Sequence, residues 1–277
     1  MVDQAARTPT WLRKRTPFSV ANGIFLVLFG LSTLYPFVHV ASVAFSTQTE
    51  ASRAGFHIYP RDVDTSNFVH VITSPDIGIS YLNTIHRTVI GTILSLIVTG
   101  AAAFTLSKPD LPSRGIIMFL IVFTMYFNGG LVPNFLLVRS LGLYDSRWAM
   151  ILPRLSAAFH IIIFKNFFQS VPAEVEESAL IDGASYYTIF ARIIVPLSKP
   201  VIATVTLWLA VGHWNAYLDN LIFMQTKSKF VLQRLIRSLL VENDMETLDS
   251  GDESNIFPES LKAATVFVST VPILAIY

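Results

Sequence analysis

Polar and aromatic side chains are concentrated in the apolar stretch 200–224, and their types suit the binding of a sugar. His213, Tyr217 and Asn220 recur at i, i+4 and i+7, so they would share one face of a continuous helix, with Trp214 beside them. Aromatic rings offer a flat apolar face to a sugar ring, and imidazole and amide groups hydrogen-bond to hydroxyl groups. The alternative is that these residues lie at a membrane–water interface, where Trp and Tyr are common.

Together with this face, three further polar residues in or beside apolar stretches are predicted to line a path for a substrate. Asn128 precedes Gly129-Gly130, where an unwound helix could expose backbone groups to a cavity, and Asn215 follows Trp214. Arg154 is the third, and a charge at the centre of a membrane helix costs roughly 2.5–3.5 kcal/mol, which favours a functional role. An acidic sugar polymer would need Arg154 or His213 to face the path.

Residue types needed for catalysis or metal binding are missing or wrongly spaced. The chain has no cysteine, which excludes disulfides, thiolate metal sites and a cysteine nucleophile. Its six histidines do not pair with carboxylates at metal-ligand spacing. No H-E-x-x-H, G-x-S-x-G or P-loop lysine pattern occurs. We therefore predict no catalytic residue and no metal site in this chain.

A polar segment, 172–196, interrupts the apolar stretches and is predicted to form two short helices with a break between them. Pro172 suits a first helical turn, and Gly183 suits the left-handed position that ends a helix. Ser185 can cap the next helix, and Pro196 ends the unit. Small residues on one side would let another surface approach closely. The alternative is an ordinary loop helix.

The composition places these segments in a membrane. Hydrophobic residues make up 52% of the 277 residues and charged residues only 14%, against about 25% in soluble domains. A bilayer core about 30 Å thick needs about 20 apolar residues of helix. Six stretches qualify or nearly so, which predicts an all-α integral membrane protein with six spans in one domain: 18–45, 83–106, 115–138, 147–169, 200–224 and 261–277. The last span is short, and we expect the protein to continue beyond Tyr277.

Charge sets the expected orientation. Arg7, Arg13, Lys14 and Arg15 precede the first span and place the N-terminus in the cytoplasm. The apolar run that follows is about 25 residues long, which is too long for the core of a cleaved signal peptide. His86 and Arg87, near the outer end of the second span, are expected to extend their polar groups to the membrane surface. The net charge of +1, without a basic patch, argues against nucleic acid as a partner.

The outer loop 225–260 is predicted to contain an amphipathic helix on the protein or membrane surface. Its apolar residues recur at helical spacing, and they are Leu232, Leu235, Ile236, Leu239 and Leu240. An acidic run follows, from Glu242 to Glu253. This run is either a solvated loop or a docking site for a partner, and its charge would repel an acidic polymer.

The spacing within 172–196 resembles the EAA motif of ABC importer permeases, which reads E-A-A, three residues, G, nine residues, I-x-L-P. The matching residues are Glu177-Ser178-Ala179, Gly183 and Ile193-Ile194-Val195-Pro196, with Ser178 for Ala and Val195 for Leu as departures. The resemblance implies a type I permease fold and a coupling helix that docks in a cleft of the ATPase subunit. The residues expected to take part are Glu176, Glu177, Ser178, Ala179, Asp182, Gly183, Ala184, Ile193 and Pro196.

Shorter markers resemble the maltose-type, carbohydrate branch and its polysaccharide-uptake subgroup, which includes the second permeases of alginate importers. These markers are Phe127–Pro133, Leu141–Leu143, Trp214-Asn215 and Glu259–Ala264. The resemblance implies a non-catalytic inner-membrane subunit. Its expected partners are a second permease in a heterodimer, two ATP-binding subunits that hold ATP and Mg, and a periplasmic or extracellular substrate-binding protein.

Three alternative functions are to be weighed against a sugar importer. The substrate of such an importer could be something other than a sugar. A secondary transporter would need no ATPase, but it usually shows internal repeats, and the two halves of this chain show none. A membrane-embedded enzyme is disfavoured because the catalytic patterns are missing.

Overall fold

The computed structural model describes residues 16–242 and 258–276. Its regular secondary structure is helical in these ranges, apart from one isolated bridge between Ser46 and Val63. The described residues divide into two compact units, one that contains 16–68 with 258–267 and one that contains 69–242 with 268–276. The predicted all-α class is confirmed for the described residues.

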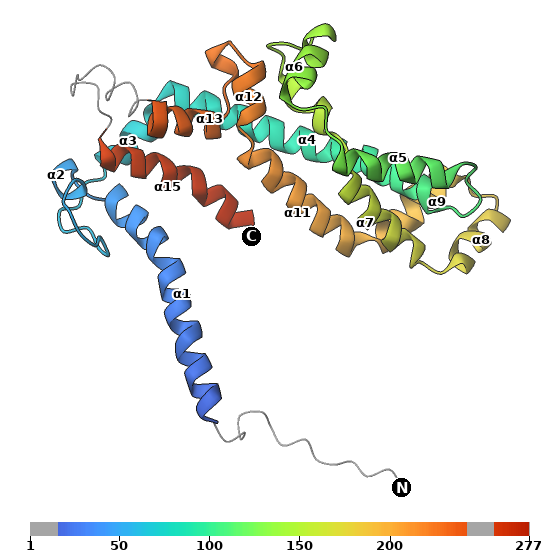
Figure 1. Ribbon diagram of the computed structural model, residues 1–277, viewed down its shortest axis with the longest axis horizontal. Coiled ribbons are helices and arrows are strands. Elements are labelled where there is room, and N and C mark those ends of the chain that lie inside the picture. The colour runs from blue at the N-terminus through green and yellow to red at the C-terminus, as the bar shows by residue number, and fades with distance from the viewer. Residues whose placement is uncertain (1–15, 243–257, 277) are drawn as a thin grey trace. The chain divides into compact units, whose positions relative to one another are not determined.

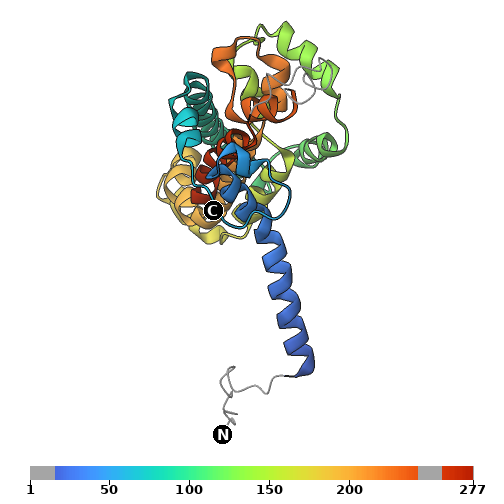
Figure 2. The ribbon, with the colours of Figure 1, turned by 90° about the vertical axis from the view of Figure 1, so that its left-hand side faces the viewer.

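The first unit contains α1 (Pro17–Ala44), a continuous helix in both Figure 1 and Figure 2. Thr16 accepts a hydrogen bond from the Ser19 amide, and Pro17 occupies the first turn, where its missing N–H costs nothing. Apolar side chains from Phe18 to Phe37 are exposed along the helix. This helix is long and apolar enough to cross a membrane, and lipid is a suitable environment for such a surface.

A second part of this unit is built around the end of α1. It includes α2 (Gln48–Ala51) and the start of α15 (Glu259–Ile276). Asn67 donates to the Ser46 carbonyl at 3.3 Å, and the Ser260 hydroxyl reaches Gln48 at 3.2 Å. Phe45, Phe68 and Phe267 add an aromatic cluster with ring centroids 4.5–6.0 Å apart. These contacts hold the start of α15 beside the segment that follows α1.

The second unit is built on three neighbouring helices: α4 (Pro75–Ser107), α7 (Ala158–Gln169) and α11 (Lys199–Asn215) (Figure 1). The buried face of α4 carries small and hydroxyl-bearing residues, which let helices approach closely in a membrane protein. These residues are Ser80, Thr84, Thr88, Gly91, Thr92, Ser95 and Thr99. Towards the end of α4 the packing becomes apolar, around Phe104, Phe164, Phe168, Ile189, Ile194 and Val205.

The remaining apolar stretches form bent pairs of helices. α5 (Arg114–Tyr126) and α6 (Leu131–Ser140) meet at 117° around Gly129-Gly130, and Gly130 has φ +86°. A 3-10 segment, η2 and η3 (Arg147–Met150, Leu152–Arg154), meets α7 at 50°. Two helices of the described residues could cross a membrane alone, or up to five spans form if each bent pair counts once. The predicted count of six is therefore not confirmed, because hydropathy does not report bends.

The predicted helix across 200–224 is not continuous. α11 ends at Asn215, and α12 (Leu218–Phe223) begins after Ala216 and Tyr217, which have extended and irregular backbone angles. The interpretation that His213, Tyr217 and Asn220 share one face of a single helix is therefore wrong. The break separates His213 from the other two residues.

The segment 172–196 forms α8 (Ala173–Ile181), α9 (Tyr186–Ile189), a π-helical turn η4 (Phe190–Ile194) and α10 (Val195–Leu197). Gly183 has φ +79°, which only glycine adopts readily, and the Ser185 hydroxyl caps α9 by accepting from the Thr188 amide. The predicted break at Gly183 and cap at Ser185 are confirmed. Figure 1 shows α8 and α9 at one end of α4, α7 and α11.

The opposite end carries α12, α13 (Leu232–Arg237) and the π-helical turn η6 (Ser238–Glu242) (Figure 1). Leu232 and Ile236 of α13 are buried, and α13 packs on α4. The sequence left open whether this amphipathic helix lies on the protein or on the membrane surface. In the structure it lies on the protein. The acidic run that the sequence places after Glu242, at 243–253, lies outside the described residues.

Candidate functional site

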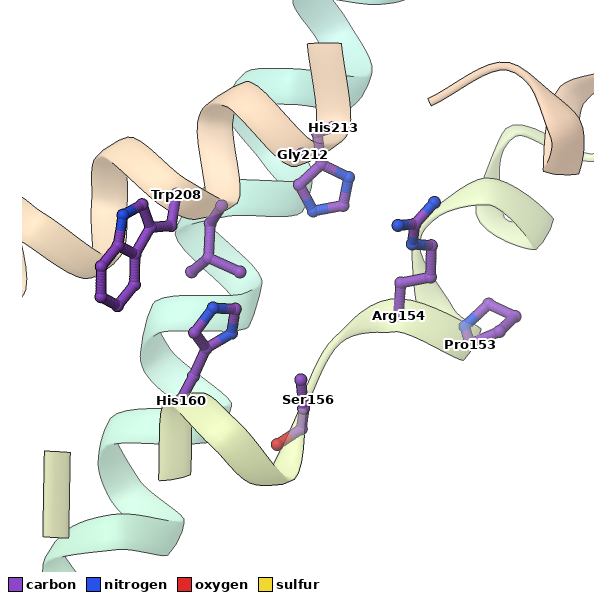
Figure 3. A pocket seen from close by; sticks show the side chains of 9 residues that line it. Pro153, Arg154, Ser156, His160, Trp208, Gly212 and His213 are labelled. Atoms are coloured by element: carbon purple, nitrogen blue, oxygen red, sulfur yellow. The ribbon is translucent and has the colours of Figure 1, made fainter. Parts of the chain in front are cut away.

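A pocket of about 290 Å³ lies between α7, α11 and the turn that leads into α7 (Figure 3). Its polar and aromatic side chains come from two directions. η3 and the following extended residues supply Arg154 and Ser156, while His160 lies on the first turn of α7. The side chains of Trp208 and His213 project from α11, and the backbone of Gly212 completes that wall of the pocket. The full lining is Pro153, Arg154, Ser156, Ala157, His160, Trp208, Leu209, Gly212 and His213.

The aromatic side of the pocket presents flat rings and imidazole nitrogens. The His160 and Trp208 rings stack with centroids 6.3 Å apart and an interplanar angle of 26°. The Nδ1 atoms of His160 and His213 are buried and have no hydrogen-bond partner among the described residues. An unpaired buried polar group costs about 1–3 kcal/mol, so these two atoms lower the stability of the fold.

One lining residue of the pocket, Arg154, belongs to an ion cluster. Arg87 of α4 is fully buried and pairs with Asp219 of α12. Arg154 lies at the same carboxylate, with its Nη1 atom 3.6 Å from Asp219 Oδ2. The predicted extension of Arg87 to the membrane surface is wrong, because Asp219 offers a closer partner inside the protein.

Of the predicted path residues, Arg154 and His213 line this pocket, and the structure brings them together. Trp214 is buried with its ring 6.0 Å from that of Tyr81. Asn215 is exposed at the end of α11. Asn128 is also exposed, and its Oδ1 atom accepts a hydrogen bond from the Gly130 amide at 2.8 Å, which fixes the turn before α6.

Tyr217 and Asn220 belong to the end of this unit that carries α12 and α13, and they do not line the pocket. The guanidinium of Arg237 lies 4.7 Å from the centre of the Tyr217 ring. Asn220 is fully buried, and its amide donates to the Lys229 carbonyl at 3.0 Å while its Oδ1 atom accepts from Val231 at 3.5 Å. The Asn220 side chain thus holds the loop that leads into α13.

Sequence reasoning missed His160 and Trp208, and it did not pair Arg87 with Asp219. One signal was available for the pair. A charged residue in an apolar segment is costly unless an opposite charge neutralises it, and the two residues belong to apolar stretches that each contain one such charge. No comparable signal marked His160, which differs from an ordinary helix residue only through its tertiary position.

The segment 172–196 presents a second cluster of functional candidates at the far end of α4. Lys108 forms an ion pair with Glu176 of α8 and lies 4.0 Å from the centre of the Phe104 ring. A groove of about 550 Å³ surrounds this pair and reaches Glu177 and Tyr186.

The predicted coupling residues divide into exposed and packed groups. Glu177, Ser178, Asp182, Gly183 and Pro196 are exposed. Ala179 is buried in the core of this unit, and Glu176, Ala184 and Ile193 are partly buried. The exposed group leaves one side of α8 and its C-terminal turn available to a partner.

The family follows from comparison with known proteins. Residues 91–276 match the family of binding-protein-dependent transport system inner membrane components, and this range contains the pocket, α8 and the whole of α11. The chain belongs to this permease family. Members are integral proteins of the inner membrane. The matched range contains both the segment 172–196 and the residues that line the pocket.

Two curated relatives of this permease family come from Bacillus subtilis (strain 168). The polygalacturonan/rhamnogalacturonan transport system permease protein YtcP is 40% identical over 259 residues, which cover 91% of this chain and 90% of the relative. Protein LplC is 38% identical over 262 residues, which cover 94% of this chain and 89% of the relative.

Solved structures of transporters match as well. A chain of a bacterial ABC transporter involved in the import of the acidic polysaccharide alginate superimposes with a TM-score of 0.88 and 32% identity, over 98% of this permease and 97% of that chain. A chain from a bacterial alginate ABC transporter in complex with an alginate pentasaccharide-bound periplasmic protein gives a TM-score of 0.58 at 16% identity, which is a likeness of fold alone.

Proposed function

We propose that this chain is the permease subunit of an ATP-driven ABC importer that takes up an oligo- or polysaccharide. The observation that carries the proposal is the pocket in which Arg154, His160, Trp208 and His213 converge within a permease of this family. An indole ring offers a flat face to a sugar, and guanidinium and imidazole groups hydrogen-bond to its oxygens. The relative named a polygalacturonan/rhamnogalacturonan transport system permease protein and the solved transporter of the acidic polysaccharide alginate support this substrate class.

The proposed transporter contains further subunits. A single permease of this size offers half of a pathway, so we propose a heterodimer with a second permease. Two ATP-binding subunits would bind ATP and Mg, and the exposed side of α8 with Glu177 and Gly183 would dock on one of them. An external binding protein would deliver the saccharide. The chain itself would contribute no catalytic residue.

The topology forms part of the proposal. We propose that six segments cross the inner membrane and that the N-terminus lies in the cytoplasm. The basic residues Arg7, Arg13, Lys14 and Arg15 support this orientation through the preference of such charges for the cytoplasmic side. The segment 172–196 would then lie on the side where ATP is available.

Reconstitution of the assembled transporter in proteoliposomes tests the proposal, with a matched pair of tryptophan variants. Trp208 lines the pocket and is 43% exposed, whereas Trp148 lies outside it and is 46% exposed. We expect ATP-dependent uptake of an oligosaccharide by the wild type, a loss of at least about tenfold in Trp208→Ala, and near wild-type uptake in Trp148→Ala. Equal uptake by both variants would exclude the pocket from the path.

The same vesicles distinguish the competing class of transporter. A secondary transporter uses an ion gradient and needs no ATPase, so it would accumulate substrate without ATP when this chain is reconstituted alone. Uptake under those conditions contradicts the proposal. Uptake that needs ATP inside an assembled complex supports it.

A further inference from the structure

Three charged side chains from three different elements meet at the edge of the pocket. Arg87 comes from α4, Arg154 from η3 and Asp219 from α12. Two guanidinium groups share one carboxylate, so the cluster carries one net positive charge. That charge is placed where a ligand can reach it, because the Arg154 side chain is 51% exposed and belongs to the pocket lining (Figure 3).

The two arginines hold the carboxylate in different ways. The Arg87 side chain is only 1% exposed, and its Nη1 atom donates to Asp219 Oδ1 and to the Ala216 carbonyl, both at 3.0 Å. Its Nη2 atom pairs with the other oxygen of Asp219. Arg154 approaches that second oxygen to 3.6 Å, which is beyond normal hydrogen-bond length. Arg87 therefore fixes Asp219, whereas Arg154 is attracted to it without a geometrically defined bond.

We infer that Arg154 binds a carboxylate group on the transported sugar and that Asp219, fixed by Arg87, is the internal competitor for Arg154. This inference rests on the proposed function and specifies its substrate class as a saccharide that contains uronic acid. A guanidinium pairs with a carboxylate through two parallel hydrogen bonds, and such pairs are stronger than neutral ones. The binding of one sugar carboxylate would neutralise the cluster.

Competition from Asp219 would help the site to release its ligand during transport. A site that is to conduct a solute must bind it well enough to admit it and weakly enough to release it. An arginine without a counter-ion in a partly buried pocket would hold an anionic sugar firmly, since charge interactions strengthen as water is excluded. Because Asp219 remains beside Arg154, the outgoing carboxylate can be replaced there. Release then leaves no uncompensated charge on the protein.

The position of the neighbouring rings agrees with this assignment. Figure 3 shows Arg154 and Trp208 on opposite sides of this pocket, with His160 and His213 between them. A saccharide whose carboxylate is bound at Arg154 can therefore present hydroxyl groups to the imidazoles, and the apolar face of a further sugar ring to the indole.

The test compares two trisaccharides that differ only in charge, trigalacturonate and the same trisaccharide with its carboxylates reduced to alcohols. Binding of each is measured to the assembled transporter in detergent without its binding protein, so that the binding protein cannot contribute selectivity. We expect Arg154→Gln to raise the Kd for trigalacturonate at least tenfold and to leave the Kd for the neutral trisaccharide within about twofold. The Kd of Arg154→Lys for trigalacturonate should lie between those of the wild type and Arg154→Gln. Lysine keeps the positive charge but cannot donate two parallel hydrogen bonds to a carboxylate.

Asp219→Asn removes the competitor and should have the opposite sign. We expect a Kd for trigalacturonate at least threefold lower than in the wild type, together with slower maximal uptake in proteoliposomes with all subunits. Arg139→Gln removes an exposed arginine outside the pocket and is the control, with both trisaccharides unaffected. If Asp219→Asn does not fold because Arg87 loses its partner, the two Arg154 variants, at a half-exposed position, still decide the inference.

The outcomes separate the inference from the function on which it rests. Equal Kd changes for the charged and the neutral trisaccharide in Arg154→Gln would overturn the inference, while ATP-dependent uptake of either saccharide would leave the proposed function standing. A wild-type complex that takes up no saccharide in the presence of its binding protein and ATP would overturn the proposed function itself. A selective loss of trigalacturonate binding in Arg154→Gln supports both.

Discussion

The imidazole ring of His213 rests directly on the backbone of Gly91. A Cβ atom at Gly91 would lie 2.7 Å from both Cε1 and Nε2 of this ring and 3.0 Å from Nδ1. Carbon atoms do not approach that closely without displacement. The absence of a side chain at Gly91 is therefore what lets α11 place His213 between α4 and the pocket.

Gly91→Ala is expected to displace His213 and to separate α4 from α11. Overpacking of a buried contact costs on the order of 1–3 kcal/mol. We expect a lower unfolding temperature in detergent and reduced saccharide uptake, because the displaced ring also lines the pocket.

Gly78→Ala in the same helix is the matched control, since no atom lies within 4 Å of its Cβ position. This variant should unfold at or slightly above the wild-type temperature, because alanine is the better helix former. A Gly91→Ala protein with unchanged stability and uptake would show that His213 moves without cost and has no defined place in the pocket.

Local chemistry made the segment 172–196 predictable. Gly183 ends α8 with a positive φ and Ser185 caps α9. Both effects depend on residues close together in the sequence, and so they could be recognised before the structure was known. The apolar stretches were predictable for the same reason, since the length and composition of a helix such as α1 are properties of one segment.

The pocket could not be predicted in the same way, because it depends on bends and on distant pairs. Arg87 and Asp219 are separated by 132 positions. The break after Asn215 moves Tyr217 and Asn220 away from His213, although their spacing fits one helical face. The sequence pattern placed Tyr217 and Asn220 beside His213. Only the tertiary arrangement shows that Trp208 and His160 line the pocket with His213 instead.

The ion pair between Lys108 and Glu176 joins α4 to α8, and we expect it to transmit force between them. Both side chains are 21% exposed, and Lys108 also lies over the Phe104 ring. A double-mutant cycle with Lys108→Ala and Glu176→Ala should give a coupling energy of about 0.5–1 kcal/mol in unfolding measurements. The number of saccharide molecules taken up per ATP hydrolysed should fall in both variants.

Charge exchange provides the control for this pair. Lys108→Glu combined with Glu176→Lys should recover most of the lost coupling, because it restores opposite charges at the same places. Lys199→Ala removes an exposed lysine and should leave the ratio unchanged. A cycle with no interaction energy would assign the two residues independent surface roles.

Asp145 lies outside the predicted membrane-spanning segments and holds the loop between α12 and α13 through hydrogen bonds. We expect these bonds to make the stability of the protein depend on pH. Hydrogen bonds from Thr226, with Lys229 and the Gln225 amide adding to them, hold the pKa of the Asp145 carboxyl well below its usual range. A depressed folded-state pKa stabilises the fold above the unfolded pKa of about 3.9. That contribution is lost as the pH falls from there towards the folded value.

The measurement is the unfolding temperature of wild type and Asp145→Asn across pH. We expect the variant to unfold at a lower temperature at about pH 6, with the difference shrinking as the pH approaches about 3. Asp110→Asn, at an exposed position, should follow the wild type. A difference that grows towards acid pH would show that the carboxyl is not stabilised in its charged form.

Gly183 is expected to tolerate substitution worse than Glu177, for a reason visible in the backbone. Gly183 has φ +79°, but no atom of this chain lies within 4 Å of its Cβ position. The cost within the chain is therefore the backbone strain alone, on the order of 1 kcal/mol. If α8 docks on an ATPase subunit, Gly183→Asp should also lose that subunit during purification, whereas Gly183→Ala should retain more of it. Glu177→Ala should lower uptake more mildly, and full retention of ATPase by Gly183→Asp would argue against docking at this turn.

Ser178→Cys tests the same docking directly, because the chain has no other cysteine to react. Ser178 is exposed on α8, and its hydroxyl donates only to the Glu174 carbonyl one turn earlier, at 2.7 Å. The substitution therefore removes one local hydrogen bond and leaves the helix in place. We expect efficient cross-linking to a cysteine introduced in the cleft of the ATPase subunit, with a yield that changes when ATP is added. In intact cells a membrane-impermeant thiol reagent should not label the residue from outside. Labelling from outside would show that α8 lies outside the cell, where no ATPase subunit is present. Both the proposed topology and the proposed function would then be wrong.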